Sequence, residues 1–129
     1  MDIKTKYASP LVLNEILISE SKFSRVESSI ENVELGINVE RNIEKISKEE
    51  YRIVLEVTVT DDNEKVFVYV KCVARFNTEQ ENMDLIERNI IAIMFPYVRS
   101  YISTLTTQPG MAPIVLPAMN IVAMLNEKK

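Results

Sequence analysis

The sequence predicts an α+β fold: a four-stranded antiparallel sheet with one long, kinked helix and one short helix packed on one of its faces. Strand-like segments joined by short turns fill the chain up to residue 76, and helical spacing begins only after them. Strands followed by helices are typical of an antiparallel sheet with helices on one face, whereas alternating strands and helices build parallel sheets. Because we find no repeat, low-complexity tract or linker, we expect residues 1–129 to form one domain.

Four segments have strand character. Residues 11–20 carry aliphatic side chains on both parities, which predicts a strand with a bulge or a strand covered on two faces. Residues 33–40 and 51–60 alternate between apolar and polar, as half-buried strands do. Turn-forming residues 61–64 lead into residues 65–76, so the last two strands are expected to form a hairpin.

The last strand is apolar on both faces. One face carries Val66, Val68, Val70, Cys72 and Ala74, and the other carries Phe67, Tyr69 and Val73. Either the strand is central and its second face is shielded by loops or by the N-terminal segment, or the sheet contacts another subunit. In the second interpretation the candidate oligomer interface consists of Val68, Val70, Cys72 and Ala74.

A long helix follows the strands. Thr78 and Glu81 match a capping box, which places the helix N-cap at Thr78. The helical periodicity then runs through Met83, Ile86, Ile90, Ile93, Met94, Tyr97, Tyr101 and Leu105. We expect the helix to end near Thr106 and a short apolar helix to span residues 118–127.

Pro96 interrupts this helix, and the segment after the helix is unusually apolar. Proline lacks an N–H group, so the carbonyl of Ala92 loses its helical partner at a cost of roughly 3 kcal/mol, which predicts a kink. The apolar residues beyond the helix are Met111, Ile114, Val115, Leu116 and Met119. Loops normally lie on the surface and are polar, so this segment is either buried or keeps apolar groups available for binding.

Composition excludes several classes of function. The formal net charge of −4 argues against binding nucleic acid, whose phosphates require clustered Lys and Arg. No apolar run is long enough for a signal peptide or a membrane span, so we expect a cytoplasmic protein without membrane insertion. Cys72 is the single cysteine, so no internal disulfide can form, as is usual in a reducing compartment.

The sequence offers little catalytic chemistry. It has no histidine, and its two glycines, Gly36 and Gly110, do not form a phosphate-binding loop. The carboxylates of Glu81, Asp84 and Glu87 would suit a hard cation in a small metal-dependent enzyme, but a solvated helix start is the commoner explanation. We therefore expect no enzyme, no catalytic residues, no metal site and no cofactor.

Three segments resemble the SecB-type protein-export chaperones. The long helix matches the family's Phe-Pro-Tyr-x-Arg segment with Phe95, Pro96, Tyr97 and Arg99. The segment YRIVLEVTVT is similar to the family's third strand, and LVLNEILISESKF, which ends at Phe23, is similar to its first. The resemblance extends from about Leu11 to Leu125 and includes the proline-containing connection and the short helix.

This resemblance implies an ATP-independent holdase. Such chaperones assemble as homotetramers, as dimers of dimers, and bind unfolded polypeptides or preproteins. They deliver these clients to the export ATPase SecA and use no nucleotide themselves. The connection between the two helices helps to form a groove for extended client segments.

The resemblance, together with the apolar residues, suggests which side chains contact a client. The candidates are Phe23, Phe76, Tyr97, Tyr101, Met111, Ile114, Leu116 and Met119. Methionine is flexible and polarizable, so a wall that contains it adapts to many sequences. The alternative is that most of these side chains fill the core or a subunit interface.

The link to SecA is only partly supported by the residues. Glu20 falls where the first-strand acid of the SecA-docking surface belongs, whereas Ser24 and Lys71 stand where further acids are expected. Two other functions therefore stay open. One is a SecB-like chaperone dedicated to the antitoxin of a toxin–antitoxin system, and the other is an oligomeric scaffold that binds one folded partner.

Overall fold

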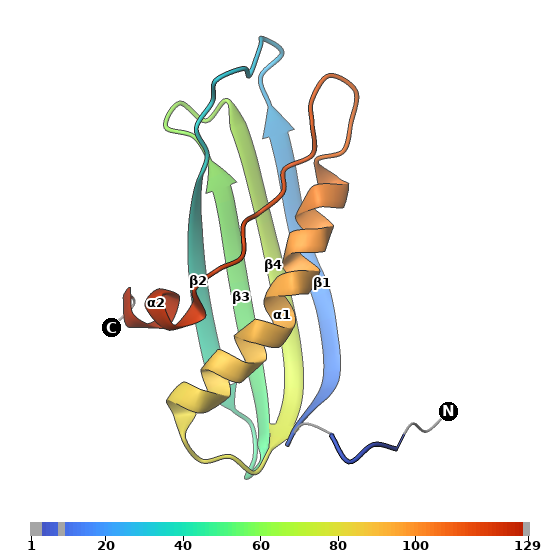
Figure 1. The fold of residues 1–129 in the computed structure, drawn as a ribbon, viewed down its shortest axis with the longest axis vertical. Helices are drawn as coiled ribbons and strands as arrows, with labels where there is room; N and C mark the ends of the chain where they lie inside the picture. The colour runs from blue at the N-terminus through green and yellow to red at the C-terminus, as the bar shows by residue number, and fades with distance from the viewer. Residues whose placement is uncertain (1–3, 8–9, 128–129) are drawn as a thin grey trace.

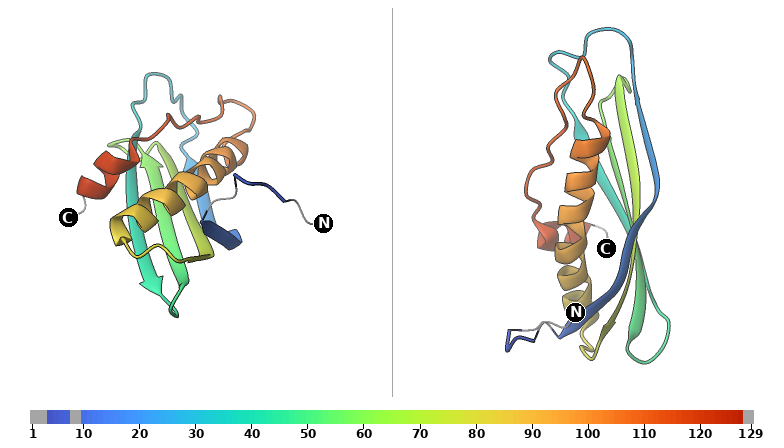
Figure 2. Two further views of the ribbon diagram at one scale, coloured as in Figure 1. Left: turned by 60° about the horizontal axis from the view of Figure 1, so that its bottom comes forward. Right: turned by 90° about the vertical axis from the view of Figure 1, so that its right-hand side faces the viewer.

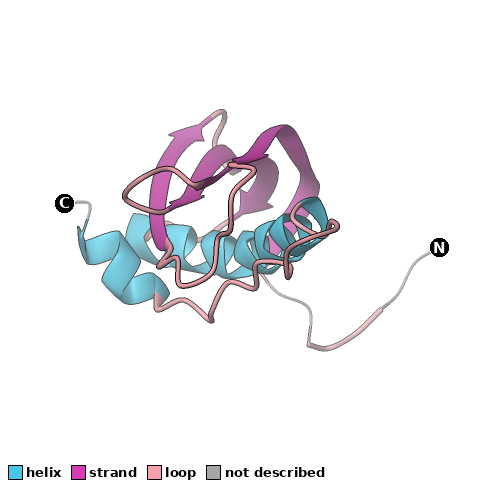
Figure 3. Ribbon diagram, turned by 90° about the horizontal axis from the view of Figure 1, so that it is seen from above, coloured by secondary structure: helices cyan, strands magenta, loops and turns pink. Residues whose placement is uncertain are grey.

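The computed structural model describes residues 4–7 and 10–127, in which four strands form one antiparallel sheet and two helices cover one face of it (Figures 1 and 3). The elements are β1 (Leu11–Arg25), β2 (Gly36–Lys45), β3 (Glu50–Thr60), β4 (Val66–Thr78), α1 (Met83–Leu105) and α2 (Ile121–Glu127). The strands lie in the order β1-β4-β3-β2, so β1 and β2 form the two edges. This arrangement confirms the predicted α+β fold.

The core lies between α1 and the two central strands. Side chains at every fourth position of α1 point to the sheet and are at most 1% exposed: Ile86, Ile90, Met94, Val98 and Ile102. They pack on the alternate residues of β3 and β4 that face the same way, including Leu55, Val70 and Cys72. Such a stripe at i, i+4 spacing is what fixes an amphipathic helix on a sheet. Because α1 crosses the sheet diagonally, it begins near β2 and ends near β1 (Figure 1).

Within the described residues, the opposite face of the sheet carries no helix (Figure 2). Cross-strand register places side chains there in rows: Glu44, Arg52, Arg75 and Glu15 in one row, and Glu40, Glu56, Lys71 and Glu20 in another. Between these rows lie the apolar side chains of Val54, Val73 and Leu17. The second apolar face of β4 is therefore shielded by long charged neighbours, as expected for a central strand. Nearby, a hydrogen bond from the Tyr69 hydroxyl to the Glu56 carboxylate raises the pKa of Tyr69 to about 12.

Two bulges explain the mixed pattern of β1. The register of β1 against β4 shifts between Leu13 and Glu15 and again between Ile18 and Glu20. Each extra residue reverses the parity of the inward-facing side chains. The less exposed positions therefore follow as Leu11 and Leu13, then Ile16 and Ile18, then Ser21 and Phe23. The predicted bulge is confirmed, and the strand continues five residues beyond its predicted end.

The sequence placed β2 too early. Val33 and Leu35 precede the strand, which begins at Gly36 and continues to Lys45. The second half of the strand is mostly polar. An edge strand can carry polar side chains, since its backbone pairs with β3 and its side chains border the solvent. Local alternation therefore identified the first half only.

The predicted capping box is wrong. Thr78 ends β4, and its N–H group donates to the Glu49 carbonyl at 2.9 Å. The N-cap of α1 is Asn82, whose side-chain oxygen accepts from the Leu85 N–H at 3.2 Å. Glu81 therefore precedes the helix.

The other helix boundaries are closer to expectation. The C-cap of α1 is Thr106, as predicted, and the helix continues through Pro96. Ala92 and Pro96 both lie on the exposed side of α1, where water can bond to the carbonyl that proline leaves unpaired. The short helix begins at Ile121, later than predicted, and the Asn120 side chain caps it by accepting from the Ala123 N–H at 3.0 Å.

The β3–β4 turn depends on the ionised carboxylate of Asp61. Its oxygens accept from the N–H groups of Val66 at 2.9 Å and Asn63 at 3.2 Å. The hydrogen bond from Val66 is the main reason that the pKa of Asp61 lies below its usual value of 3.8, and burial opposes it. Because the pKa is lower in the folded state than in the unfolded chain, the ionised carboxylate stabilises the protein at pH values above about 3.8. This stabilisation is lost as the pH falls through the folded-state pKa.

We predict that Asp61→Asn lowers the free energy of unfolding more at about pH 7 than at about pH 3. The measurement is urea denaturation of both proteins at the two pH values, at one subunit concentration. Asp62→Asn, at an exposed position in the same turn, is the matched control and should have little effect. A deficit for Asp61→Asn that is the same at both pH values would contradict this role.

Candidate functional site

The connection between the helices is fixed to the core at two points. It leaves α1 near β1, turns at Gln108–Met111 and returns across the covered side of the sheet to α2 beside β2 (Figure 1). The Thr106 hydroxyl accepts from the Ile114 N–H at 2.9 Å, and the Ser103 hydroxyl donates to the Ile114 carbonyl at 2.9 Å. Leu116 is 2% exposed and belongs to the core. These contacts hold the connection as a wall beside the sheet.

An apolar hollow of about 490 Å³ lies at the turn end of this wall. We call it the loop hollow. Its lining includes Ile30, Val33 and Leu35 from the segment before β2, and Met111, Ile114 and Val115 from the connection. Val115 is 67% exposed, so an apolar side chain is held at the surface between two that point inward.

A second hollow, of about 260 Å³, lies between β2 and α2. We call it the α2 hollow, and its apolar lining comes from Ile37 and Val39 of β2 and from Met119, Ala123 and Met124. Leu35 and Ile37 follow one another along one wall, and Val115 and Met119 along the other. The loop hollow and the α2 hollow therefore follow one another along the chain that leads into and through edge strand β2, and we call the two together the trough.

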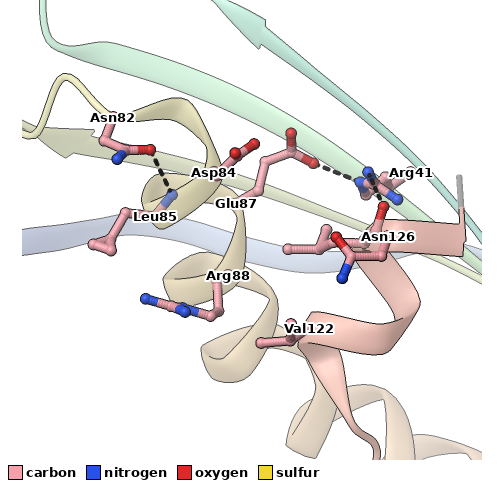
Figure 4. A pocket seen from close by; sticks show the side chains of 9 residues that line it. Arg41, Asn82, Asp84, Leu85, Glu87, Arg88, Val122 and Asn126 are labelled. Atoms are coloured by element: carbon pink, nitrogen blue, oxygen red, sulfur yellow. Dashed lines mark hydrogen bonds and ion pairs between the residues drawn. The ribbon is translucent and has the colours of Figure 1, made fainter. Parts of the chain in front are cut away.

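A hollow of about 280 Å³ whose lining includes several charged residues lies on the other side of α2, between α2 and the start of α1 (Figure 4). Arg41 of β2 reaches into it. The Nε atom of Arg41 lies 2.5 Å from Oε2 of Glu87, and each of these side chains is only 15% exposed. The same guanidinium donates from Nη2 to the carbonyl of Leu125 at 3.4 Å.

A fourth hollow, of about 350 Å³, lies on the far side of α1 against β1. Its lining includes Ile16, Leu17 and Ile18 of β1 and Tyr97 and Tyr101 of α1. The Tyr101 hydroxyl is hydrogen-bonded to the Ser21 hydroxyl at 2.8 Å, while Tyr97 is 54% exposed. We call this surface the β1 patch.

The structure separates the eight predicted client-binding residues. Met111 and Ile114 line the loop hollow, and Met119 lines the α2 hollow. Tyr97 and Tyr101 lie on the β1 patch, away from the trough. Of the eight predicted residues, three therefore line the trough and two lie on a different surface.

Of the remaining three candidates, Phe76 and Leu116 belong to the core and Phe23 packs against it. Phe76 is fully buried and stacks on Tyr51 with ring centroids 5.4 Å apart. Leu116 is 2% exposed, and Phe23 is half-buried against the core. Phe76 and Leu116 are corrections: a completely enclosed side chain cannot contact a client on the surface.

Sequence reasoning missed several residues of the trough. No sequence pattern indicates a role for Ile30, and the alternation over residues 33–40 predicts Val33 and Leu35 in a strand. The signal was present, because Val33, Leu35, Ile37 and Val39 alternate without interruption. It indicated that they share one side, but it did not indicate that the first two precede the strand and face the connection.

The predicted oligomer interface on β4 lies inside the protomer. Val68, Val70, Cys72 and Ala74 are 0% exposed because α1 covers them. They therefore have no surface with which to contact a second subunit, and the candidate interface was placed on the wrong face. Burial also raises the pKa of the Cys72 thiol to about 11, which leaves the thiol protonated near neutral pH.

Glu20 lies on the open face of the sheet among basic residues. It is 3.4 Å from the Lys22 amino group and opposite Lys71 in the register of β1 and β4. Ser24 follows on the same strand face. The carboxylate is therefore part of a mixed charge pattern, not of a continuous acidic surface.

The carboxylates of Glu81, Asp84 and Glu87, which would suit a hard cation, do not gather into one site. Glu81 lies before α1, Asp84 lies in its first turn, and Glu87 is paired with Arg41. Within residues 4–7 and 10–127, no three His, Cys, Asp or Glu side chains cluster in a way that would hold a metal ion.

Neither helix of the described chain combines the length and the apolar character required to cross a lipid bilayer.

Known proteins resemble this chain in sequence and in fold. Residues 18–129 match the family model SecB, described as preprotein translocase subunit SecB. The chain is 28% identical over 112 residues to an uncharacterized protein of Methanocaldococcus jannaschii, which covers 79% of this chain and 72% of the relative.

Two solved structures share the fold at 10% identity. One is the SecB-like chaperone Rv1957 of Mycobacterium tuberculosis in complex with a ChAD peptide from the Rv1956 HigA1 antitoxin, with a TM-score of 0.70 over 85% of this chain and 90% of that chain. The other is a protein of unknown function from Streptococcus agalactiae, with a TM-score of 0.50 over 84% of this chain and 97% of that chain.

The burial of Leu116 and the exposure of Val115 can be tested as a pair. We predict that Leu116→Ala lowers the free energy of unfolding by about 2–5 kcal/mol, because it removes a core side chain. Val115→Ala should change it by no more than about 0.5 kcal/mol, because that side chain is exposed. Urea denaturation at one subunit concentration measures both values, and equal losses would contradict this arrangement of the wall.

Proposed function

The chain belongs to the SecB family, and we propose from this premise that it is an ATP-independent holdase that captures unfolded polypeptides in the trough beside β2. The observation that supports this proposal best is the exposed apolar lining of the loop hollow, with Val115 at its rim. Exposed apolar surface of this kind is typical of a site for a polypeptide or other apolar ligand. We place this activity in the cytoplasm, where preproteins and antitoxins are still unfolded.

The trough offers two kinds of contact to an extended segment. Apolar side chains of the client would enter the loop hollow and the α2 hollow, where Met111, Met119 and Met124 adapt to different shapes. Burial of one large apolar side chain contributes about 1.5–3 kcal/mol, so several weak subsites together give useful affinity. The backbone of the client would lie along β2, since an edge strand can add an extended peptide.

Two client classes follow from this chemistry. One is preproteins that are passed to SecA. The other is an antitoxin, and it is favoured by the position of Glu20 between Lys22 and Lys71, which weakens the acidic surface that SecA docking would use. The fold shared with Rv1957, which was solved with an antitoxin peptide, agrees with the second class.

For assembly we propose a homotetramer, a dimer of dimers, that uses the β1 patch. Tyr97 is 54% exposed, and Ile16 and Ile18 of β1 line the same hollow, so the patch has apolar surface to bury. It lies beside edge strand β1, which can pair with a second strand. This proposal replaces the inner face of β4 as the subunit contact.

Client capture is tested with a chemically unfolded protein that aggregates on dilution. We predict that the purified chain suppresses this aggregation, and that Val115→Asp weakens client binding by about tenfold, because a charge at the rim of the loop hollow removes apolar burial. Ile46→Asp is the matched control, since Ile46 is 47% exposed on the β2–β3 turn, away from the trough. No suppression by the unmodified chain would refute the holdase.

Retention of several unrelated unfolded chains separates the holdase from the alternative scaffold. A scaffold would retain one native partner and release unfolded proteins.

Assembly is tested by sedimentation velocity at about micromolar concentration. We predict that the unmodified chain sediments as a tetramer and that Tyr97→Glu gives dimers or monomers, because a carboxylate opposes burial of the β1 patch. Tyr7→Glu, at a tyrosine that is 80% exposed near the N-terminus, should leave the tetramer unchanged. A stable monomer of the unmodified chain would contradict the proposed assembly.

A further inference from the structure

The methionines that the structure describes lie in three environments. Met94 is fully buried, and Met124 is 8% exposed and also belongs to the core. Met83 is 40% exposed at the start of α1 and lines neither hollow of the trough. Met111 and Met119 are partly exposed, one in the lining of the loop hollow and the other in that of the α2 hollow. Each hollow of the trough therefore presents a thioether that solvent can reach.

Met111 is positioned by its backbone and not by packing of its side chain. Its N–H group donates to the Gln108 carbonyl at 3.5 Å in the turn after α1. Gly110 takes a φ of 85° in this turn, which glycine adopts without strain. The Met111 side chain lines the hollow without packing against the core. A chemical change of this side chain therefore alters the hollow and leaves the core intact.

Met119 is the more restricted of the two trough methionines. It packs partly against the core and lines the α2 hollow beside Ile37 of β2. An added oxygen atom has less room there than at Met111. Met111 is therefore the first site at which we expect oxidation to change the trough, and Met119 is the second.

A thioether that solvent can reach is oxidised by peroxides. The O–O bond of hydrogen peroxide breaks, an S–O bond forms, the sulfur loses two electrons, and water leaves. A methionine sulfoxide reductase reverses the step: a dithiol supplies two electrons, the S–O bond breaks, and the oxygen again leaves as water. The single thiol of the chain, that of Cys72, is enclosed and protonated, so it does not compete for the oxidant.

Oxidation would change what the loop hollow can bind. The sulfoxide oxygen is a hydrogen-bond acceptor, and its neighbours in the lining include the apolar side chains of Ile30, Val33 and Ile114. In the free protein, water can bond to this oxygen. An apolar client side chain would displace that water and leave the acceptor without a partner, which costs free energy. The oxidised hollow therefore opposes the apolar burial on which capture depends.

We propose that Met111, together with Met119, is a reversible oxidation site, and that peroxide lowers client capture by making the trough polar. The first half of this statement concerns the free chain alone. The second half rests on the proposed holdase function.

The first experiment follows oxidation of the free, folded protein by hydrogen peroxide. Peptide mass spectrometry gives the rate of sulfoxide formation at each methionine, and near-ultraviolet circular dichroism checks that the fold persists. We expect Met111 and Met119 to react at least about tenfold faster than the enclosed Met94, with Met83 as the internal standard for an exposed thioether. Equal rates for Met94 and the trough methionines would overturn the oxidation site.

The second experiment imitates the sulfoxide without an oxidant. Glutamine is a polar side chain of similar length, so Met111→Gln should weaken binding of reduced, carboxymethylated lactalbumin, an unfolded chain, by about fivefold. Met83→Gln is the matched control, since Met83 is exposed outside the trough, and it should leave binding unchanged. Equal affinities of the two variants would contradict a role for polarity at residue 111.

The third experiment compares each protein with itself before and after peroxide treatment, once the oxidant has been removed. The unmodified chain and Met83→Leu should lose affinity for the client, and methionine sulfoxide reductases for both sulfoxide epimers should restore it. The double variant Met111→Leu/Met119→Leu should keep the affinity that it had before treatment. If it loses as much as the unmodified chain, the trough methionines are not the site of the effect. If the untreated, unmodified chain binds no client, the holdase fails and the effect on capture fails with it, while the rates of the first experiment still decide the oxidation site.

Discussion

The burial of one face of α1 on one face of the sheet is the constraint on which the rest of the structure depends. Every fourth residue from Ile86 to Ile102 is enclosed against β3 and β4, which occupy the centre of the sheet. Because α1 is narrower than the sheet, it leaves the sheet uncovered on two sides: toward β2, where the connection and α2 form the trough, and toward β1, where the β1 patch lies. The two surfaces to which we assign client binding and assembly are these two sides.

The connection between the helices turns the first of these sides into a trough. Hydrogen bonds to Ile114 and burial of Leu116 fix its backbone, so the residue between them, Val115, must face outward. The apolar loop is stable here because Leu116 completes the core, and Ile114 and Met119 pack against it. Val115 remains at the surface, where it is available for the client binding that we propose. Neighbouring residues of one segment thus serve stability and the proposed client capture.

Charge is distributed differently on the two sides of the sheet. On the open face, acids and bases are mixed across the strands, and Glu20 has Lys22 and Lys71 as neighbours. On the covered side, the pair of Arg41 and Glu87 is half-buried, and Arg41 has a further acceptor in α2. An exposed pair contributes little to stability, whereas a half-buried guanidinium with two acceptors constrains the elements around it. The charges of the open face flank the apolar side chains of Val54, Val73 and Leu17, and the Arg41–Glu87 pair helps to hold α2 in place.

The sequence by itself determined the order of strands and helices, the end of α1 near Thr106 and the resemblance to the family, because periodicity and short motifs are local; for β1 it left a bulge and coverage on two faces as alternatives. Only the tertiary structure decided which apolar residues are enclosed. It placed Phe76 and the inner face of β4 beneath α1, and it engaged the Thr78 N–H in the sheet, which moved the helix start to Asn82. A pattern shows which side chains share a face, but whether that face meets solvent, a helix or a distant loop depends on contacts between residues far apart in the chain. For the same reason the sequence did not indicate the contacts of Arg41, whose partners lie 46 and 84 residues away.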